Sequence, residues 1–168
     1  MIHNLNSIHL LLVAAAAGCI YLSVREVRRH YISTWRLFAP GLFALFIGTV
    51  LSLLQLGERE PPPAWLFGAA LGGGIAVGTL RGLTINIRHD MYRPQVNLSH
   101  KSRLLLVWVA IVAAAAVAVE CVGAFLGSPD LEMLRRGAAL VAMLCGGAML
   151  GRALLLTLRV YHANRVNA

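Results

Sequence analysis

Three ionisable residues interrupt apolar stretches of this 168-residue sequence, and their chemistry is the first feature that needs an explanation. Arg81, Glu120 and Arg152 each lie in a run of apolar residues long enough to cross a bilayer. A charged side chain in hydrocarbon costs several kcal/mol unless it is paired or hydrated. Each of the three is therefore a candidate site for binding or moving a proton, a cation or an anion.

Glu120 has two interpretations. A helix rises about 1.5 Å per residue, which places Glu120 about two helical turns from Arg152 along the membrane normal, too far for a direct ion pair. In the first interpretation the carboxylate reaches the nearer interface and meets Arg135 or Arg136. In the second it is protonated and buried, with Gln55 at a similar depth, and forms a proton or cation site.

The two arginines come close to the same membrane surface. Their long, flexible stems predict that Arg81 and Arg152 snorkel to the lipid headgroups. The alternative is a pocket for an anion or a lipid headgroup between the third and fifth apolar runs.

The remaining reactive side chains are not arranged for catalysis, metal binding or electron transfer. Cys19, Cys121 and Cys145 all lie in apolar runs and form no CxxC pair, which predicts buried free thiols. The six histidines fall in loops or at the ends of apolar runs, so no two are expected to face each other across a haem. Because paired carboxylates and a nucleophile with a nearby base are also missing, we expect no enzymatic activity, no metal and no cofactor.

The composition is that of a membrane protein. Hydrophobic residues make up 58% of the chain and charged residues 13%, whereas a soluble domain averages about a quarter charged residues. The formal net charge of +8 would suit nucleic-acid binding, but the basic residues stand between apolar runs rather than on one polar face. All of them except Lys101 are arginine, which together with many alanines points to a GC-rich bacterial genome.

Five apolar runs predict an all-α bundle of five transmembrane helices in a single domain, residues 1–168. The first run lacks the positive segment that precedes a secretory signal, so we expect it to be retained. Residues 16–19 weakly resemble a lipoprotein cleavage site, but the run stays apolar beyond Cys19. The predicted spans are residues 8–24, 35–56, 65–87, 104–126 and 138–160.

The third run is rich in glycine, which is costly in a soluble helix but serves helix packing in lipid. Glycines four residues apart lie on one helix face and let a neighbouring helix approach closely. The glycine faces exceed what one five-helix bundle needs, so they predict association with another chain. The predicted packing glycines are Gly68, Gly72, Gly74, Gly78 and Gly82 in the third run and Gly147 and Gly151 in the fifth.

The distribution of Lys and Arg predicts the orientation, because cytoplasmic loops carry an excess of both. Twelve of the 15 basic residues fall beside the first and third connections or at the C-terminus, and three fall on the other side. The N-terminus is therefore expected outside and the C-terminus in the cytoplasm.

Two connections carry patterns of their own. Residues 84–88 and 95–99 alternate apolar and polar side chains, which favours either a short hairpin at the membrane surface within 84–99 or an irregular loop. Ser128, with Glu132 nearby, predicts a short surface turn of helix before the fifth span.

Residues 65–125 carry a recognisable order of features: the glycine-rich run with Arg81-Gly82 at its cytoplasmic end, a turn containing Asp90, and Ser99 or Ser102 before an apolar run with Trp108. In this order the stretch resembles the CcdC-like group of small bacterial membrane proteins. Met-Tyr-Arg-Pro follows the aspartate where the group usually has a glycine turn. The group is named for a neighbour of cytochrome c maturation genes and has no established activity, so the resemblance implies topology and no reaction.

These observations predict a multi-pass protein of the bacterial inner (cytoplasmic) membrane that acts as a non-catalytic accessory or scaffold. Its expected partners are lipid and a second copy or another membrane protein, met through the Gly74, Gly78 and Gly82 face, with no nucleic acid. The alternative is a small transporter or ion-pathway subunit that uses Glu120. No internal repeat is present, which makes a self-contained transporter the weaker interpretation.

Overall fold

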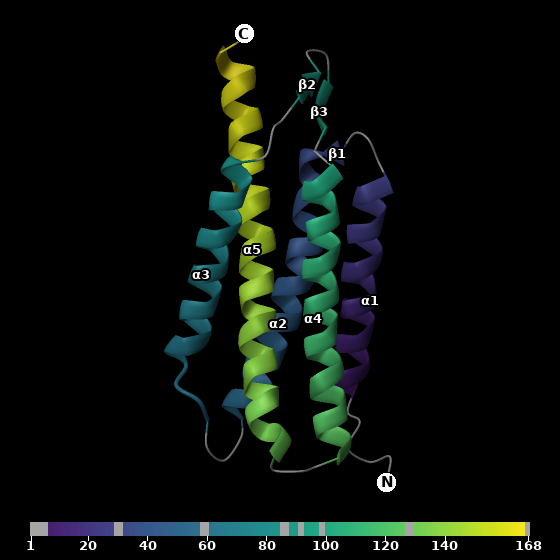
Figure 1. The fold of residues 1–168 in the computed structure, drawn as a ribbon, viewed down its shortest axis with the longest axis vertical. Coiled ribbons are helices and arrows are strands. Elements are labelled where there is room, and N and C mark those ends of the chain that lie inside the picture. The colour runs from purple at the N-terminus through teal and green to yellow at the C-terminus, as the bar shows by residue number, and fades with distance from the viewer. Residues whose placement is uncertain are drawn as a thin grey trace.

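The computed structural model consists of five α-helices that run up and down as one bundle (Figure 1). It describes residues 7–28, 32–57, 61–84, 88–90, 93–97, 100–126 and 130–166. All five helices are long and apolar enough to cross a membrane, as expected of a multi-pass membrane protein. The helices are α1 (Ser7–Arg28), α2 (Phe38–Leu56), α3 (Trp65–Leu83), α4 (His100–Leu126) and α5 (Asp130–Val166).

The start of α1 and the end of α5 lie at opposite ends of the bundle, which we call the N-terminal end and the C-terminal end (Figure 1). Helix α5 is the longest and packs against α2, α3 and α4, whereas α1 packs against α2 and α4. Helix α3 packs against α5 and lies at the edge of the bundle (Figure 1).

Several helix boundaries differ from the predicted spans: α2 begins at Phe38 rather than at residue 35, α4 begins at His100 rather than at residue 104, and α5 ends at Val166 rather than at residue 160. Helix α1 continues from Val24 to Arg28, and α3 ends at Leu83 rather than at residue 87. Helix α5 begins at Asp130, so the segment predicted as a separate surface turn is part of the fifth helix from that residue on. An ion pair between Glu132 and Arg136, one turn apart, supports this early start; the predicted cap Ser128 lies outside the described residues.

The C-terminal end carries a three-stranded antiparallel sheet of order β1-β3-β2. Strands β2 (Arg88–Asp90) and β3 (Arg93–Asn97) form a hairpin within residues 84–99, the first of the two predicted alternatives, with Arg88 opposite Asn97. Both strands lie nearer to the turn than the predicted arms, residues 84–88 and 95–99. Strand β1 (Ile32–Ser33), which was not predicted, pairs with β3 and leads through the 3₁₀-helix η1 (Thr34–Leu37) into α2. The first and third connections are therefore joined at one end of the bundle.

Small side chains fill the interior of the bundle. The main core cluster contains alanines of α1, α4 and α5 together with larger residues such as Ile47 and Leu51 of α2. Large apolar side chains, among them Leu10, Leu80 and Met133, point outward. A soluble protein rarely exposes so much apolar surface, whereas lipid requires it.

Candidate functional site

The most deeply buried charged group is the carboxylate of Glu120 on α4, which is 1% exposed. Arg135 of α5 binds it with two hydrogen bonds, Nη2 to Oε1 at 2.5 Å and Nε to Oε2 at 3.1 Å. Gln55 of α2 donates from Nε2 to Oε2 at 3.3 Å. Three helices are thus joined through one carboxylate, and the two-pronged contact is the geometry that best offsets its burial.

Gly123 makes this ion pair sterically feasible. It follows Glu120 by three residues, on the same face of α4, and a Cβ atom at this position would collide with Cδ of Arg135. The stem of Arg135 therefore crosses the surface of α4 at Gly123 before its guanidinium reaches the carboxylate. Any larger residue at position 123 would displace Arg135.

Two further polar atoms are buried near this level without a hydrogen-bond partner among the described residues. One is Oε1 of Gln55, whose other amide atom binds Glu120. The other is Nδ1 of His9, a residue of α1 that is 8% exposed. Buried polar atoms without a partner are uncommon, so His9 and Gln55 stand out as polar groups in the interior of this end of the bundle.

The depth of His9 follows from the second buried ion pair. Arg152 of α5 donates from Nη2 to Oε1 of Glu26 on α1 at 3.1 Å, and both side chains are more than nine-tenths buried. The number of residues from His9 to Glu26 on α1 equals the number from Arg135 to Arg152 on α5. The two helices run in the same direction (Figure 1). His9 therefore lies at about the depth of Arg135, some 25 Å along the bundle from the second pair.

The pairing of Arg152 with Glu26 overturns the prediction that Arg152 snorkels to the headgroups. Because α1 continues to Arg28, Glu26 lies on the inner face of this helix. The guanidinium of Arg152 therefore binds inside the bundle instead of reaching the headgroups. Arg81 is exposed, as a snorkelling residue is, and the two arginines do not converge on a shared pocket. As expected, Glu120 and Arg152 do not meet; each has its own partner.

The glycines of α3 divide into two groups with different surroundings. A Cβ at Gly74 or Gly78 would collide with the backbone carbonyl of Leu144 or Ala148 on α5, and one at Gly82 would lie 2.8 Å from Leu155. On the other side of this interface, Gly147 and Gly151 of α5 lie against the backbone of α3 at Leu71 and Ile75. The glycines expected to meet a partner protein at positions 74, 78 and 82 thus hold α3 on α5 of the same chain.

The second glycine group faces away from the bundle. Gly68, Gly72 and Gly73 have no atom outside their own helix within 4 Å of the place where a Cβ would be, among the described residues. Ala69 and Ala76 are exposed on the same side of α3. We call these five residues the open face of α3.

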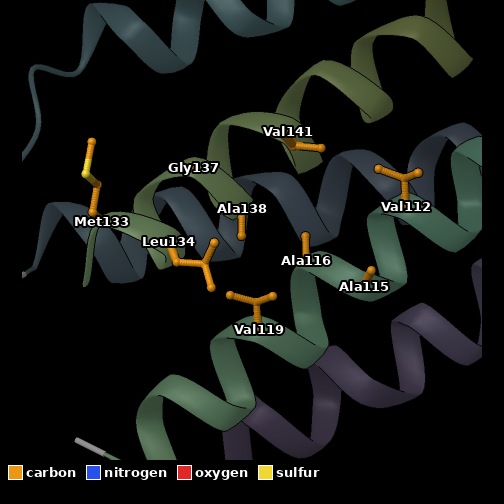
Figure 2. A pocket seen from close by; sticks show the side chains of 9 residues that line it. All are labelled: Val112, Ala115, Ala116, Val119, Met133, Leu134, Gly137, Ala138 and Val141. Carbon is orange, nitrogen blue, oxygen red and sulfur yellow. The ribbon is translucent and has the colours of Figure 1, made fainter. Parts of the chain in front are cut away.

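An apolar groove lies between α4 and α5 near the N-terminal end, with a volume of about 610 Å³ (Figure 2). Small side chains such as Ala115 and Ala116 of α4 and Ala138 of α5 line it, together with the more exposed Met133 and Leu134. None of the nine residues that line it carries a charge or a hydrogen-bonding side chain (Figure 2). The groove is suited to hydrocarbon and offers no chemistry of its own.

The described residues bring no three metal-binding side chains together. The thiols of Cys19 and Cys145 are buried and that of Cys121 is half-buried, and all three cysteines are free. Cys19 contributes a hydrogen bond from Sγ to the Pro40 carbonyl oxygen at 3.5 Å, which is a packing contact between α1 and α2.

Sequence reasoning missed Glu26, His9 and Gly123 as parts of the buried polar groups. A signal for the first two was present, because the buried positions 9, 12, 16, 19, 23 and 26 of α1 alternate spacings of three and four residues. Extending that pattern past Val24 places Glu26 on the inner face. Gly123 carries no such signal, since its role depends on which helix passes over it.

No protein-family model, curated protein or solved structure matches this chain.

Proposed function

We propose that this chain is a non-catalytic accessory or scaffold protein of the bacterial cytoplasmic membrane that binds a further transmembrane helix through the open face of α3. In this proposal the N-terminus is outside and the C-terminal end, with its sheet, is in the cytoplasm, as the distribution of basic residues favours. The resemblance to the CcdC-like group agrees with such a role and adds no reaction.

The observation that supports the proposal most directly is the position of Gly68, Gly72 and Gly73. In a membrane, helices associate by close packing, and small residues at every fourth position allow it. The fold uses such contacts at Gly74, Gly78 and Gly82, where α3 meets α5. The same helix carries a second small-residue face that no described residue covers, and a second transmembrane helix is the partner that such a face accommodates.

A second candidate function, an ion or proton pathway, is favoured by the polar groups around Glu120. His9 and Gln55 each have a buried polar atom without a hydrogen-bond partner among the described residues, which suits a transient proton or water. The bond of Glu120 to Arg135 argues for the accessory role instead, because a carboxylate held by two hydrogen bonds is not free to exchange an ion.

The test is the mass of the intact complex after mild extraction of the tagged chain from the membrane, measured by native mass spectrometry. We expect an assembly heavier than the 18.1 kDa chain, either a homo-oligomer or a complex with another membrane protein. The variant Gly72→Leu, which fills the open face, should release the monomer. Ala118→Leu places the same side chain at an exposed site of α4 and should leave the assembly intact.

A wild-type chain that is monomeric, or a Gly72→Leu variant that assembles like the wild type, would contradict the proposal. The second candidate is then examined in liposomes. Proton flux through the wild type that disappears in Glu120→Gln would identify the pathway. Flux that is absent from the wild type, or unchanged in Glu120→Gln, would exclude a role for Glu120 in such a pathway.

A further inference from the structure

The guanidinium of Arg36, at the C-terminal end of the bundle, has no hydrogen bond or ion pair with any described residue, a property that it shares with the exposed Arg28 and Arg81. Arg152 binds Glu26, and Arg159 donates to the carbonyl oxygens of Gly82 and Leu83 at the end of α3. Arg25 lies over the ring of Tyr21. Arg36 is exposed and available to a ligand.

Arg36 also lines a cleft whose other described residues are apolar. The cleft has a volume of about 290 Å³ and is formed with Phe38, Ala39 and Leu42 in the first turns of α2. Leu42 is 56% exposed, so the cleft opens on the outer surface of the bundle rather than on its core. Among the described residues, the Arg36 guanidinium is thus the single charged group that lines this apolar cleft.

The order of these residues along the chain matches the layers of a bilayer. Arg36 lies two residues before the apolar helix α2 begins, at the level where headgroups meet water. Leu42 lies four residues after Phe38, the first residue of that helix, and therefore about 6 Å deeper than the start of the helix, where acyl chains begin. Phosphate at Arg36 and hydrocarbon against Leu42 would occupy both parts of the site at once.

The charge of this end selects an anionic ligand. Two described acidic residues lie there: Glu26, which is already bound to Arg152, and Asp90 of β2. Arg25, Arg28 and Arg81 add positive charge without a described carboxylate beside them. A zwitterionic headgroup would gain little from such a field, whereas a headgroup with net negative charge is attracted by it.

We propose that the cleft formed by Arg36, Phe38, Ala39 and Leu42 binds an anionic phospholipid, with its phosphate on the Arg36 guanidinium and an acyl chain along Leu42. The site is independent of the open face of α3, which lies on another helix. It binds lipid whether or not the chain assembles with a partner.

The experiment is native mass spectrometry of the full chain released from nanodiscs that contain equal amounts of phosphatidylglycerol and phosphatidylcholine. The wild type should retain phosphatidylglycerol in preference to phosphatidylcholine. In Arg36→Gln the preference should fall by more than about fivefold, because fivefold is what one basic side chain contributes at a lipid surface without a specific site. Arg81→Gln removes an exposed arginine outside the cleft and should lower the preference by no more than that diffuse contribution.

The apolar half of the site is tested by Leu42→Trp, which fills the cleft and leaves Arg36 in place; Ala39→Leu is the second filling variant if Leu42→Trp does not fold. Either should lose the retained lipid. The proposal is overturned if the filled variants retain phosphatidylglycerol, or if Arg81→Gln loses as much as Arg36→Gln, which would mean diffuse attraction. Displacement of the lipid by excess glycerol 3-phosphate would also overturn it, since a free phosphate would then suffice.

Discussion

At the scale of single residues, the buried charges of this protein are paired across helices. Glu120 is bound by Arg135 and Gln55, and Glu26 is bound by Arg152. A buried ion pair contributes little net stability when compared with apolar residues of the same shape, but removal of one partner leaves a charge in a medium that cannot solvate it. These pairs therefore fix which helices are neighbours more than they raise the overall stability.

Loss of Arg135 should accordingly be among the most damaging single substitutions in the chain. Arg135→Ala leaves the Glu120 carboxylate with Gln55 alone and should lower the free energy of unfolding by about 3–5 kcal/mol. The double variant Glu120→Met with Arg135→Met removes both charges and should recover most of that loss. Unfolding in detergent micelles, followed by circular dichroism during titration with a denaturing detergent, measures the difference.

Arg81→Ala is the matched control for this prediction, because Arg81 is exposed and outside both ion pairs. Its effect should stay within about 0.5 kcal/mol, as for other surface substitutions. If Arg135→Ala were as mild as Arg81→Ala, the Glu120 site would not need its cation, and the ion pair would not hold α4 on α5.

At the scale of helices, the contact between α3 and α5 depends on glycine from both sides. Gly74 and Gly78 admit the backbone of α5, and Gly147 and Gly151 admit the backbone of α3. Backbones this close leave no room for a methyl group, so the interface has little tolerance for substitution.

The two glycine groups of α3 should respond in opposite ways to the same small change. Gly78→Ala forces a methyl group against the Ala148 carbonyl and should cost about 1–3 kcal/mol, the usual penalty for overpacking. Gly72→Ala meets open space and should change the stability of the isolated chain by less than about 0.5 kcal/mol. The same unfolding titration compares them, and equal losses would mean that α3 does not pack on α5 through Gly78.

The existence of five helices could be predicted from hydropathy alone, because each apolar run is long and separated from the next by polar residues or proline. Their ends could not, since α1 continues to Arg28 and α5 begins at Asp130, and hydropathy does not record the ion pairs of Glu26 and Glu132 in these added turns. The glycine spacing showed that close packing would occur at Gly78, but not which helix would fill that face. The partner of a glycine face, like that of Arg152, is a property of the tertiary arrangement.

At the scale of the whole molecule, the two buried ion pairs lie toward opposite ends of the bundle. Arg135 and Arg152 both belong to α5, and the segment from Gly137 to Gly151 carries no ionisable side chain except Cys145. Their separation of about 25 Å is close to the hydrocarbon thickness of roughly 30 Å. Each pair thus lies near the level where one membrane surface begins, and the apolar core lies between them.

The proposed function and the proposed lipid site both depend on the same membrane arrangement. In it, α3 and its neighbours cross the membrane, and the basic C-terminal end lies on the cytoplasmic side. The most direct test is labelling of single cysteines with a membrane-impermeant maleimide, in a chain whose three native cysteines are replaced. Ala64→Cys and Leu126→Cys report on the N-terminal end, and Thr84→Cys and His162→Cys on the C-terminal end.

We predict that, in intact bacterial spheroplasts, positions 64 and 126 are labelled, whereas positions 84 and 162 are labelled only after lysis. Labelling of positions 64 and 84 from the same side would contradict the account, because α3 would then not cross the membrane. The reversed pattern would preserve the five crossings but contradict the orientation, and the Arg36 cleft would then face the outer leaflet.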